Sequence, residues 1–153
     1  EARVVLANLI SVLRSLWQYR FLFNSGIHVA QLDGRLAHKI NNHRRFLEDE
    51  ITKGLQDAVR RGEMRRPEIR DGIPLLGQTM VALWLQWLHQ FNILEPKATE
   101  PSPKALRSCL RLHYHALLPY AAKEFSDTSW AEIDRQFPAP KRRTSQRLGR
   151  TRQ

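Results

Sequence analysis

The sequence has very little of several features that mark particular protein classes. Its 153 residues include one cysteine, Cys109, so no internal disulfide can form and a secreted disulfide scaffold is excluded. It contains no run of 18 uninterrupted apolar residues, and residues 1–5 lack the regions of a signal peptide. We therefore expect one cytoplasmic domain, without a membrane span and long enough to bury a core.

Sequence motifs of enzymes and metal sites are missing as well. The chain has no GxSxG, phosphate-loop or GxGxxG pattern, no HExxH and no paired cysteines. His113 and His115 are two residues apart, so on a helix they would point in different directions and could not share a metal ion. We predict that the protein is not an enzyme and uses no cofactor or metal.

Positive charge is concentrated at one end of the chain. The formal net charge is +10, and residues 141–153 contain no acidic residue. Their basic residues are Lys141, Arg142, Arg143, Arg147, Arg150 and Arg152. Such a segment attracts polyanions with a salt-dependent affinity, but blocks of like charge are commonly disordered. We predict a folded, mildly basic domain over residues 1–140 and a disordered basic tail over residues 141–153.

No alternating apolar and polar run is long enough for a sheet, so we predict an all-α fold. Apolar periodicity places long helices at residues 2–23, 34–61, 69–94 and 103–125. Asp33 and Ser102 are expected to cap two of them, Gly62 to end one, and Pro119 to bend the last. A capping box at Ser129 starts a short terminal helix. The result is an antiparallel bundle of about four long helices plus a short C-terminal helix.

Residues 69–94 are apolar on most of the expected helix circumference, so this helix must be covered from more than one side. A broad stripe contains Ile73, Leu76, Met80, Leu83, Trp84, Trp87, Phe91 and Leu94. The opposite face contains Gln78, Ala82, Leu85, Gln86 and His89. That second face carries no full charge, which is unusual for a surface in water and reasonable for one that meets another helix.

Large aromatic and soft apolar residues recur at helical spacing. The candidates for a ligand pocket are Trp17, Phe21, Phe46, Met80, Trp84, Trp87 and Phe91. Such residues can form a plain hydrophobic core, which is the commoner case, or line a cavity for a small apolar ligand. Both interpretations stay open from the residues alone.

Three short segments carry a family resemblance. Tyr19-Arg20-Phe21-Leu22-Phe23-Asn24, Leu32-Asp33-Gly34-Arg35-Leu36-Ala37 and Asn42-His43-Arg44-Arg45 resemble the C-terminal regulatory domain of TetR-family transcriptional repressors. In this sequence Leu22 replaces the usual aromatic residue, Asn24 the usual Arg or Asp, and Gly34 the usual Pro. The resemblance covers about residues 2–125.

The resemblance implies a homodimer that binds a small, largely apolar effector. The last two long helices of each subunit would form a four-helix interface, with Gln78, Ala82, Leu85, His89, Leu106, Cys109, Leu110, His113 and Leu117 as the corresponding residues. The family's helix-turn-helix is not found in this sequence, which opens inside a helix. Operator DNA would therefore be bound only through a missing N-terminal domain.

A second hypothesis is a helical protein-interaction or non-specific nucleic-acid-binding module. In that case the uncharged helix face would bind another protein and the basic tail would hold nucleic acid. The oligomeric state distinguishes the two hypotheses, because the regulator requires a dimer.

Overall fold

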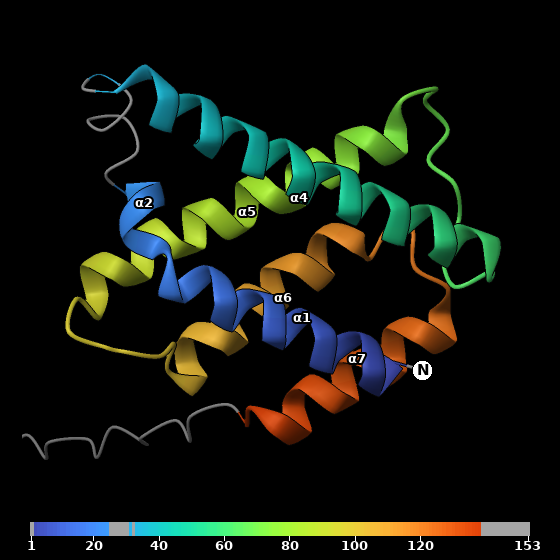
Figure 1. Ribbon diagram of the computed structural model, residues 1–153. Helices are drawn as coiled ribbons and strands as arrows, with labels where there is room; N and C mark the ends of the chain where they lie inside the picture. Colours follow the sequence, from blue (N-terminus) through green and yellow to red (C-terminus); the bar gives the residue numbers. More distant parts are fainter. Residues whose placement is uncertain (1, 25–30, 32, 139–153) are drawn as a thin grey trace, which may run out of the picture.

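The fold is all-α, as predicted. A computed structural model describes residues 2–24, 31 and 33–138, and these residues form helices and no strand (Figure 1). The helices are α1 (Ala2–Gln18), α2 (Arg20–Asn24), α4 (Gly34–Arg60), α5 (Gly72–Leu94), α6 (Pro103–Leu117) and α7 (Lys123–Gln136). The predicted connection at residues 25–30 and the predicted basic tail lie outside the described residues.

Capping side chains set several helix boundaries where the sequence predicts them. The carboxylate of Asp33 accepts a hydrogen bond from the Arg35 N–H at 2.8 Å, at the start of α4. The Ser102 hydroxyl accepts one from the Ala105 N–H at 3.1 Å, with Pro103 in the first turn of α6. Gly62 follows α4 with φ of 75°, a conformation that glycine adopts at little cost. These three predictions are confirmed.

The first predicted helix is broken at Tyr19. The backbone carbonyl of Trp17 accepts a hydrogen bond from Arg20 Nη1 at 3.0 Å. Arg20 Nη2 donates to the carbonyl of Ala98 at 2.8 Å, so this side chain also holds the loop that follows α5. The break lets the short α2 leave the axis of α1 and pack against α5 (Figure 1).

The end of the chain also differs from the prediction. Helix α6 stops at Leu117 and does not continue past a bend at Pro119, which has no N–H for a helical bond. Helix α7 begins at Lys123 after Ala122, so the predicted capping box at Ser129 is wrong, and Ser129 lies buried within the helix. Residues 118–122 form instead a connection that bonds to the segment after α4.

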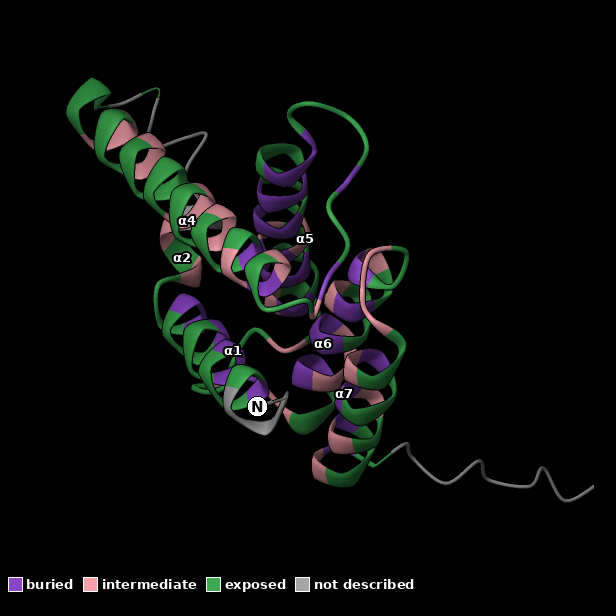
Figure 2. Ribbon diagram, turned by 90° about the vertical axis from the view of Figure 1, so that its right-hand side faces the viewer, coloured by how far each residue is buried: buried purple, intermediate pink, exposed green. Residues whose placement is uncertain are grey.

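Buried side chains gather in two clusters. The larger one joins α1, the C-terminal half of α5, α6 and α7, and includes Leu13, Trp87 and Leu110. The smaller one joins the C-terminal end of α4 to the N-terminal half of α5, and includes Leu55 and Met80. Figure 2 shows the buried surfaces of the helices facing one another.

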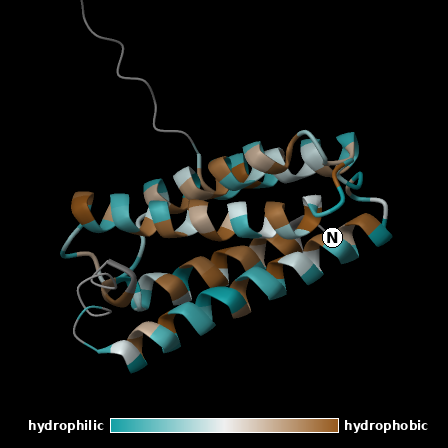
Figure 3. Cartoon of the chain, turned by 90° about the horizontal axis from the view of Figure 1, so that it is seen from above, coloured by the Kyte–Doolittle hydropathy of each residue, from teal (hydrophilic) through white to brown (hydrophobic). Residues whose placement is uncertain are grey.

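Helices α4 and α5 differ in character. All the buried residues of α4 lie toward its C-terminal end, and much of this helix is hydrophilic (Figure 3). Helix α5 contains no Asp, Glu, Lys or Arg in its 23 residues. No helix among the described residues combines the length and the apolar character that crossing a membrane requires.

Candidate ligand cavity

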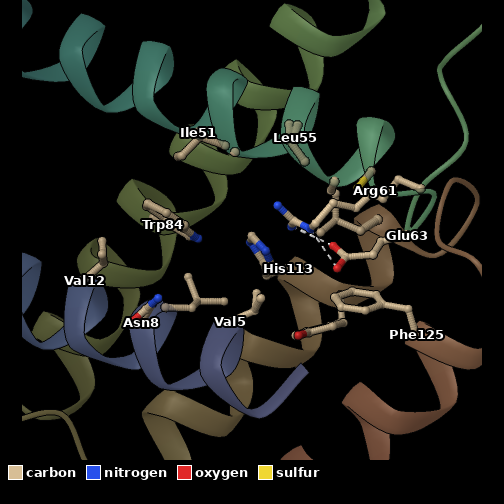
Figure 4. Close-up of a pocket in the computed structure, with 16 residues that line it drawn as sticks. Val5, Asn8, Val12, Ile51, Leu55, Arg61, Glu63, Trp84, His113 and Phe125 are labelled. Atoms are coloured by element: carbon tan, nitrogen blue, oxygen red, sulfur yellow. Dashed lines mark hydrogen bonds and ion pairs between the residues drawn. The ribbon is translucent and has the colours of Figure 1, made fainter. Parts of the chain in front are cut away.

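A cavity of about 320 Å³ lies between the two buried clusters (Figure 4). Side chains from α1, α4, α5, α6 and α7 form its walls, together with the segment that follows α4. The lining consists of Val5, Asn8, Leu9, Val12, Ile51, Gly54, Leu55, Ala58, Arg61, Glu63, Met64, Trp84, His113, Tyr114, Leu117 and Phe125. Most of this surface is apolar, as is usual for small-molecule sites.

Helical spacing explains how two of the walls form. Val5, Leu9 and Val12 follow each other at i, i+4 and i+7 along α1, and so they face the same side. Ile51, Leu55 and Ala58 repeat this spacing on α4. Between them, Gly54 has no side chain, and a Cβ added there would meet nothing within 4 Å. This glycine leaves the wall of α4 open.

Two of the aromatic side chains that line the cavity carry buried polar atoms. Trp84 of α5 and His113 of α6 are stacked with their ring centroids 5.9 Å apart and their planes at 24°. His113 as a residue keeps partial exposure, but its Nδ1 atom is buried. Burial lowers the pKa of His113 from 6.5 to about 4, because the charged imidazolium would lose its hydration. The imidazole is therefore neutral at physiological pH.

An ion pair lies at the rim, in the turn after α4. Arg61 Nε and Nη2 donate to the two carboxylate oxygens of Glu63 at 2.9 and 2.8 Å, a bidentate arrangement (Figure 4). The turn at Gly62 brings these two residues to the same side. Because each group neutralises the other, the lining presents no net charge.

The cavity has the size and the largely apolar surface of a small-molecule binding site. Among the described residues, no group of three or more His, Cys, Asp or Glu side chains could hold a metal ion. The lining offers apolar contact, two buried aromatic nitrogen atoms and a neutralised ion pair. These groups can bind and orient a small molecule.

Comparison with known proteins places the chain in a family. The family model described as TetR, bacterial transcriptional repressor, matches residues 2–128. The chain belongs to the TetR family. No curated protein and no solved structure matches the chain. The resemblance seen in the sequence is thereby confirmed, and this TetR-family domain is a domain of a transcriptional repressor.

Of the candidate pocket residues predicted for the TetR-family domain, only Trp84 lines the cavity. Trp17, Met80, Trp87 and Phe91 are buried in the two clusters. Phe21 and Phe46 are 60% and 57% exposed, because α2 and the N-terminal half of α4 lie at the edge of the bundle. Six of the seven candidate residues therefore lie away from this cavity.

The candidate dimer interface of the TetR-family domain divides in two. On α5, Gln78, Ala82 and His89 are exposed and Leu85 is half-buried, so this face is open to a partner. On α6 the predicted side chains point inward. Leu106, Cys109, Leu110 and Leu117 lie in the clusters, and His113 lines the cavity. These α6 residues therefore pack within their own chain in this structure.

Two residues could have indicated the cavity from the sequence, although neither belongs to the apolar periodicity. A glycine in the middle of a helix costs about 1 kcal/mol relative to alanine, and Gly54 is such a residue. His113 is a polar residue in an otherwise apolar stripe of α6. The remaining lining residues, such as Val5 and Glu63, cannot be told apart from other residues of their helices or loops in the sequence, because each element contributes only a few residues to the lining.

Proposed function

We propose that this TetR-family domain binds a small, largely apolar effector in the cavity and forms a homodimer through the outer face of α5. The observation that carries the proposal is the position of α5 between two surfaces. Trp84 on its inner side lines the cavity. Seven of the exposed residues of the same helix form an uncharged stripe made of Leu75, Gln78, Thr79, Ala82, Gln86, His89 and Ile93.

The composition of this stripe supports a partner of the same kind. Exposed helix faces normally carry charged residues, and a face without them suits contact with another helix. Small side chains such as Ala82 permit helix axes to approach at about 8–10 Å. On α6, the outward residues Ser108, Leu112 and His115 would complete a four-helix interface in place of the inward residues predicted from sequence.

Regulation would follow from differential binding. An effector in the cavity shifts the arrangement of the two subunits only by the difference in its affinity for the two arrangements. The arrangement of the dimer in turn sets the spacing of two DNA-reading heads, which must match the separation of the operator half-sites. Family membership favours this proposal over the interaction module considered from the sequence.

The dimer is tested with Ala82→Arg, which adds a charge to the stripe. Leu85→Arg is less suitable, because Leu85 also packs against the larger cluster. Light scattering at two protein concentrations should give a dimer for the wild type and a monomer for Ala82→Arg. Gln56→Arg, at an exposed position of α4, is the control and should remain a dimer. A monomeric wild type would overturn this half of the proposal.

The cavity is tested with naphthalene, an apolar probe, by isothermal titration calorimetry. Gly54→Leu should fill part of the cavity and weaken binding at least tenfold, by about 1.4 kcal/mol. A Cβ at this position meets nothing within 4 Å, so the fold should be retained. If effector binding and subunit association are coupled, each changes the other by the same factor. Naphthalene should therefore bind the monomeric Ala82→Arg variant with an affinity that differs from its affinity for the wild-type dimer. Equal affinity in wild type and Gly54→Leu would argue against the cavity as the binding site.

A further inference from the structure

Two buried polar atoms in the cavity have no hydrogen-bond partner among the described residues. They are Trp84 Nε1 and His113 Nδ1. Trp84 is only 4% exposed, and Figure 4 shows its indole nitrogen on the side that faces His113. A buried donor without a partner costs about 1–3 kcal/mol, so native proteins rarely keep one.

The other fully buried tryptophans set a contrast within the same chain. Trp17 Nε1 donates to the carbonyl of Ala98 at 3.3 Å, and Trp87 Nε1 donates to that of Ala105 at 2.8 Å. Both indoles lie in the larger cluster and have partners in the chain. Of these three tryptophans only Trp84 lines the cavity, and its indole nitrogen has no partner among the described residues.

The chemistry of the two atoms restricts what can satisfy them. An indole N–H only donates, so it needs an acceptor. A neutral imidazole has one donor nitrogen and one acceptor nitrogen, and Nδ1 can be either. An oxygen atom of a ligand can accept from the indole and, if it carries a hydrogen atom, donate to the imidazole. A hydroxyl group fits best, since it accepts from Trp84 and donates to an unprotonated His113 Nδ1.

The charges in the lining restrict the ligand further. Within the described lining, Arg61 and Glu63 are the only residues with full charges, and they are paired with each other. An ionised ligand would lose its hydration against walls such as Val12 and Ile51 without gaining a free counter-charge. Uncharged ligands do not carry this cost.

The geometry points to a ligand class, and the inference rests on the effector-binding function proposed above. We infer that the effector is uncharged and largely apolar, about one or two rings in size, with an oxygen that accepts from Trp84 Nε1 and contacts His113 Nδ1. The cavity volume of about 320 Å³ supports the size. It is at the lower end of the range of about 300–1,000 Å³ for small-molecule sites.

The experiment compares four probes of one shape by calorimetry. 2-Naphthol carries the hydroxyl, 2-methoxynaphthalene only accepts, naphthalene has no polar group and 2-naphthoate is an anion. 2-Naphthol should bind the wild type about tenfold more tightly than naphthalene, because it satisfies a buried donor. 2-Naphthoate should bind more weakly than naphthalene.

Two variants assign the effect to the two rings. Trp84→Phe keeps an aromatic ring but removes the donor, so 2-naphthol and naphthalene should bind with nearly equal affinity. His113→Phe should remove the advantage of 2-naphthol over 2-methoxynaphthalene, because no imidazole remains to accept a hydrogen bond from the hydroxyl group. Trp87→Phe is the control, since its N–H already bonds Ala105, and it should keep the wild-type ratio.

The outcomes separate the inference from the proposed function. If naphthalene binds and Gly54→Leu blocks it, but 2-naphthol has no advantage, the inference is overturned and the effector cavity stands. Tightest binding of 2-naphthoate would also overturn it. If none of the four probes binds the wild type, both the inference and the effector-binding proposal fail.

Discussion

At the scale of the residue, His113 shows how burial decides the state of an ionisable group. Its ring stacks on Trp84 and meets Tyr114 edge-on, with ring centroids 5.9 and 5.8 Å apart. Leu55 and Leu117, which belong to the smaller cluster, add apolar side chains to the same cavity wall. These surroundings hold the imidazole neutral, because they cannot replace the water that a charged ring requires.

We predict that acid destabilises the wild type more than His113→Phe. The pKa of His113 is about 4 in the folded protein and near 6.5 in the unfolded chain. Between these values the unfolded chain binds a proton that the folded protein does not, so stability falls as the pH drops from 6.5 toward 4 and then levels off. With partial exposure of the residue taken into account, we expect a loss of about 1–3 kcal/mol.

Urea denaturation at several pH values between 7.5 and 4 measures this effect. His38→Phe is the control, because His38 is exposed on α4 and lies outside both the cavity lining and the proposed interface, and this variant should keep the pH dependence of the wild type. Identical pH dependence in the wild type and His113→Phe would contradict a buried neutral imidazole.

At the scale of the element, the approach of α4 to α5 depends on Gly77. A Cβ at this position would lie 2.5 Å from Thr52 Oγ1 and 3.2 Å from the backbone oxygen of Glu48. The helices can pack this closely only because glycine has no side chain. Their separation also sets the distance between Trp84 on α5 and the apolar wall of α4, and hence the width of the cavity.

Gly77→Ala is therefore expected to destabilise the protein by about 1–3 kcal/mol, as overpacking usually does. The change improves helix propensity by about 1 kcal/mol, so the steric effect must exceed this gain. Gly54→Ala is the control, because its Cβ meets nothing within 4 Å, and it should stabilise by about 0.5–1 kcal/mol. Urea denaturation measures the free energy of unfolding of both variants. A Gly77→Ala variant as stable as the wild type would contradict the close packing of α4 and α5.

Arg107 of α6 binds the C-terminal end of α7. Arg107 donates to the Asp134 carboxylate at 2.6 Å and to the backbone carbonyl of Phe137, and its side chain is only 13% exposed. The end of α7 thereby gains a partner for a C-terminal carbonyl, which a helix cannot satisfy internally.

Arg107→Ala should cost about 1–3 kcal/mol, the range for a lost hydrogen bond to a charged group. The loss should be local, so hydrogen exchange should quicken in the last turns of α7 more than in α5. Lys104→Ala, at an exposed position of the same helix, should change neither measurement. Unchanged protection of α7 in Arg107→Ala would show that this side chain does not hold the helix.

At the scale of the whole molecule, the cavity separates two packed halves that α5 joins. One half contains α4, the start of α5 and the last residue of α6, Leu117, and the other contains α1, the rest of α6, α7 and the end of α5. The halves also meet where Arg65 N–H donates to the Tyr120 carbonyl and Ala122 N–H to the Glu63 carbonyl, both at 2.7 Å. A ligand in the cavity would contact both halves and so favour one relative position.

The proposed dimer makes a prediction about the stability of the whole molecule. If the subunits associate through α5, the melting temperature should rise with protein concentration, because association stabilises only the folded state. Ala82→Arg should abolish this dependence while its melting temperature at high dilution stays close to that of the wild type. A wild type whose melting temperature does not change over a hundredfold concentration range would contradict the dimer.

The sequence alone determined the class of fold and several boundaries. Asp33, Gly62 and Ser102 act through bonds and backbone angles within a few residues, so their effect can be read from the chain itself. The same holds for α5, whose lack of charge and apolar periodicity predicted a buried helix with an uncharged outer face. Family membership was also visible in local segments.

Only the tertiary structure decided the end of α6, the start of α7 and the lining of the cavity. The connection between those helices is set by backbone bonds to residues near position 64, which are distant in the sequence. A helical pattern shows that residues share a face, but it cannot show which neighbour that face meets. The apolar stripe of α6 that contains His113 is compatible by its pattern with a partner subunit, whereas in the structure its residues lie in the chain's own clusters and cavity wall.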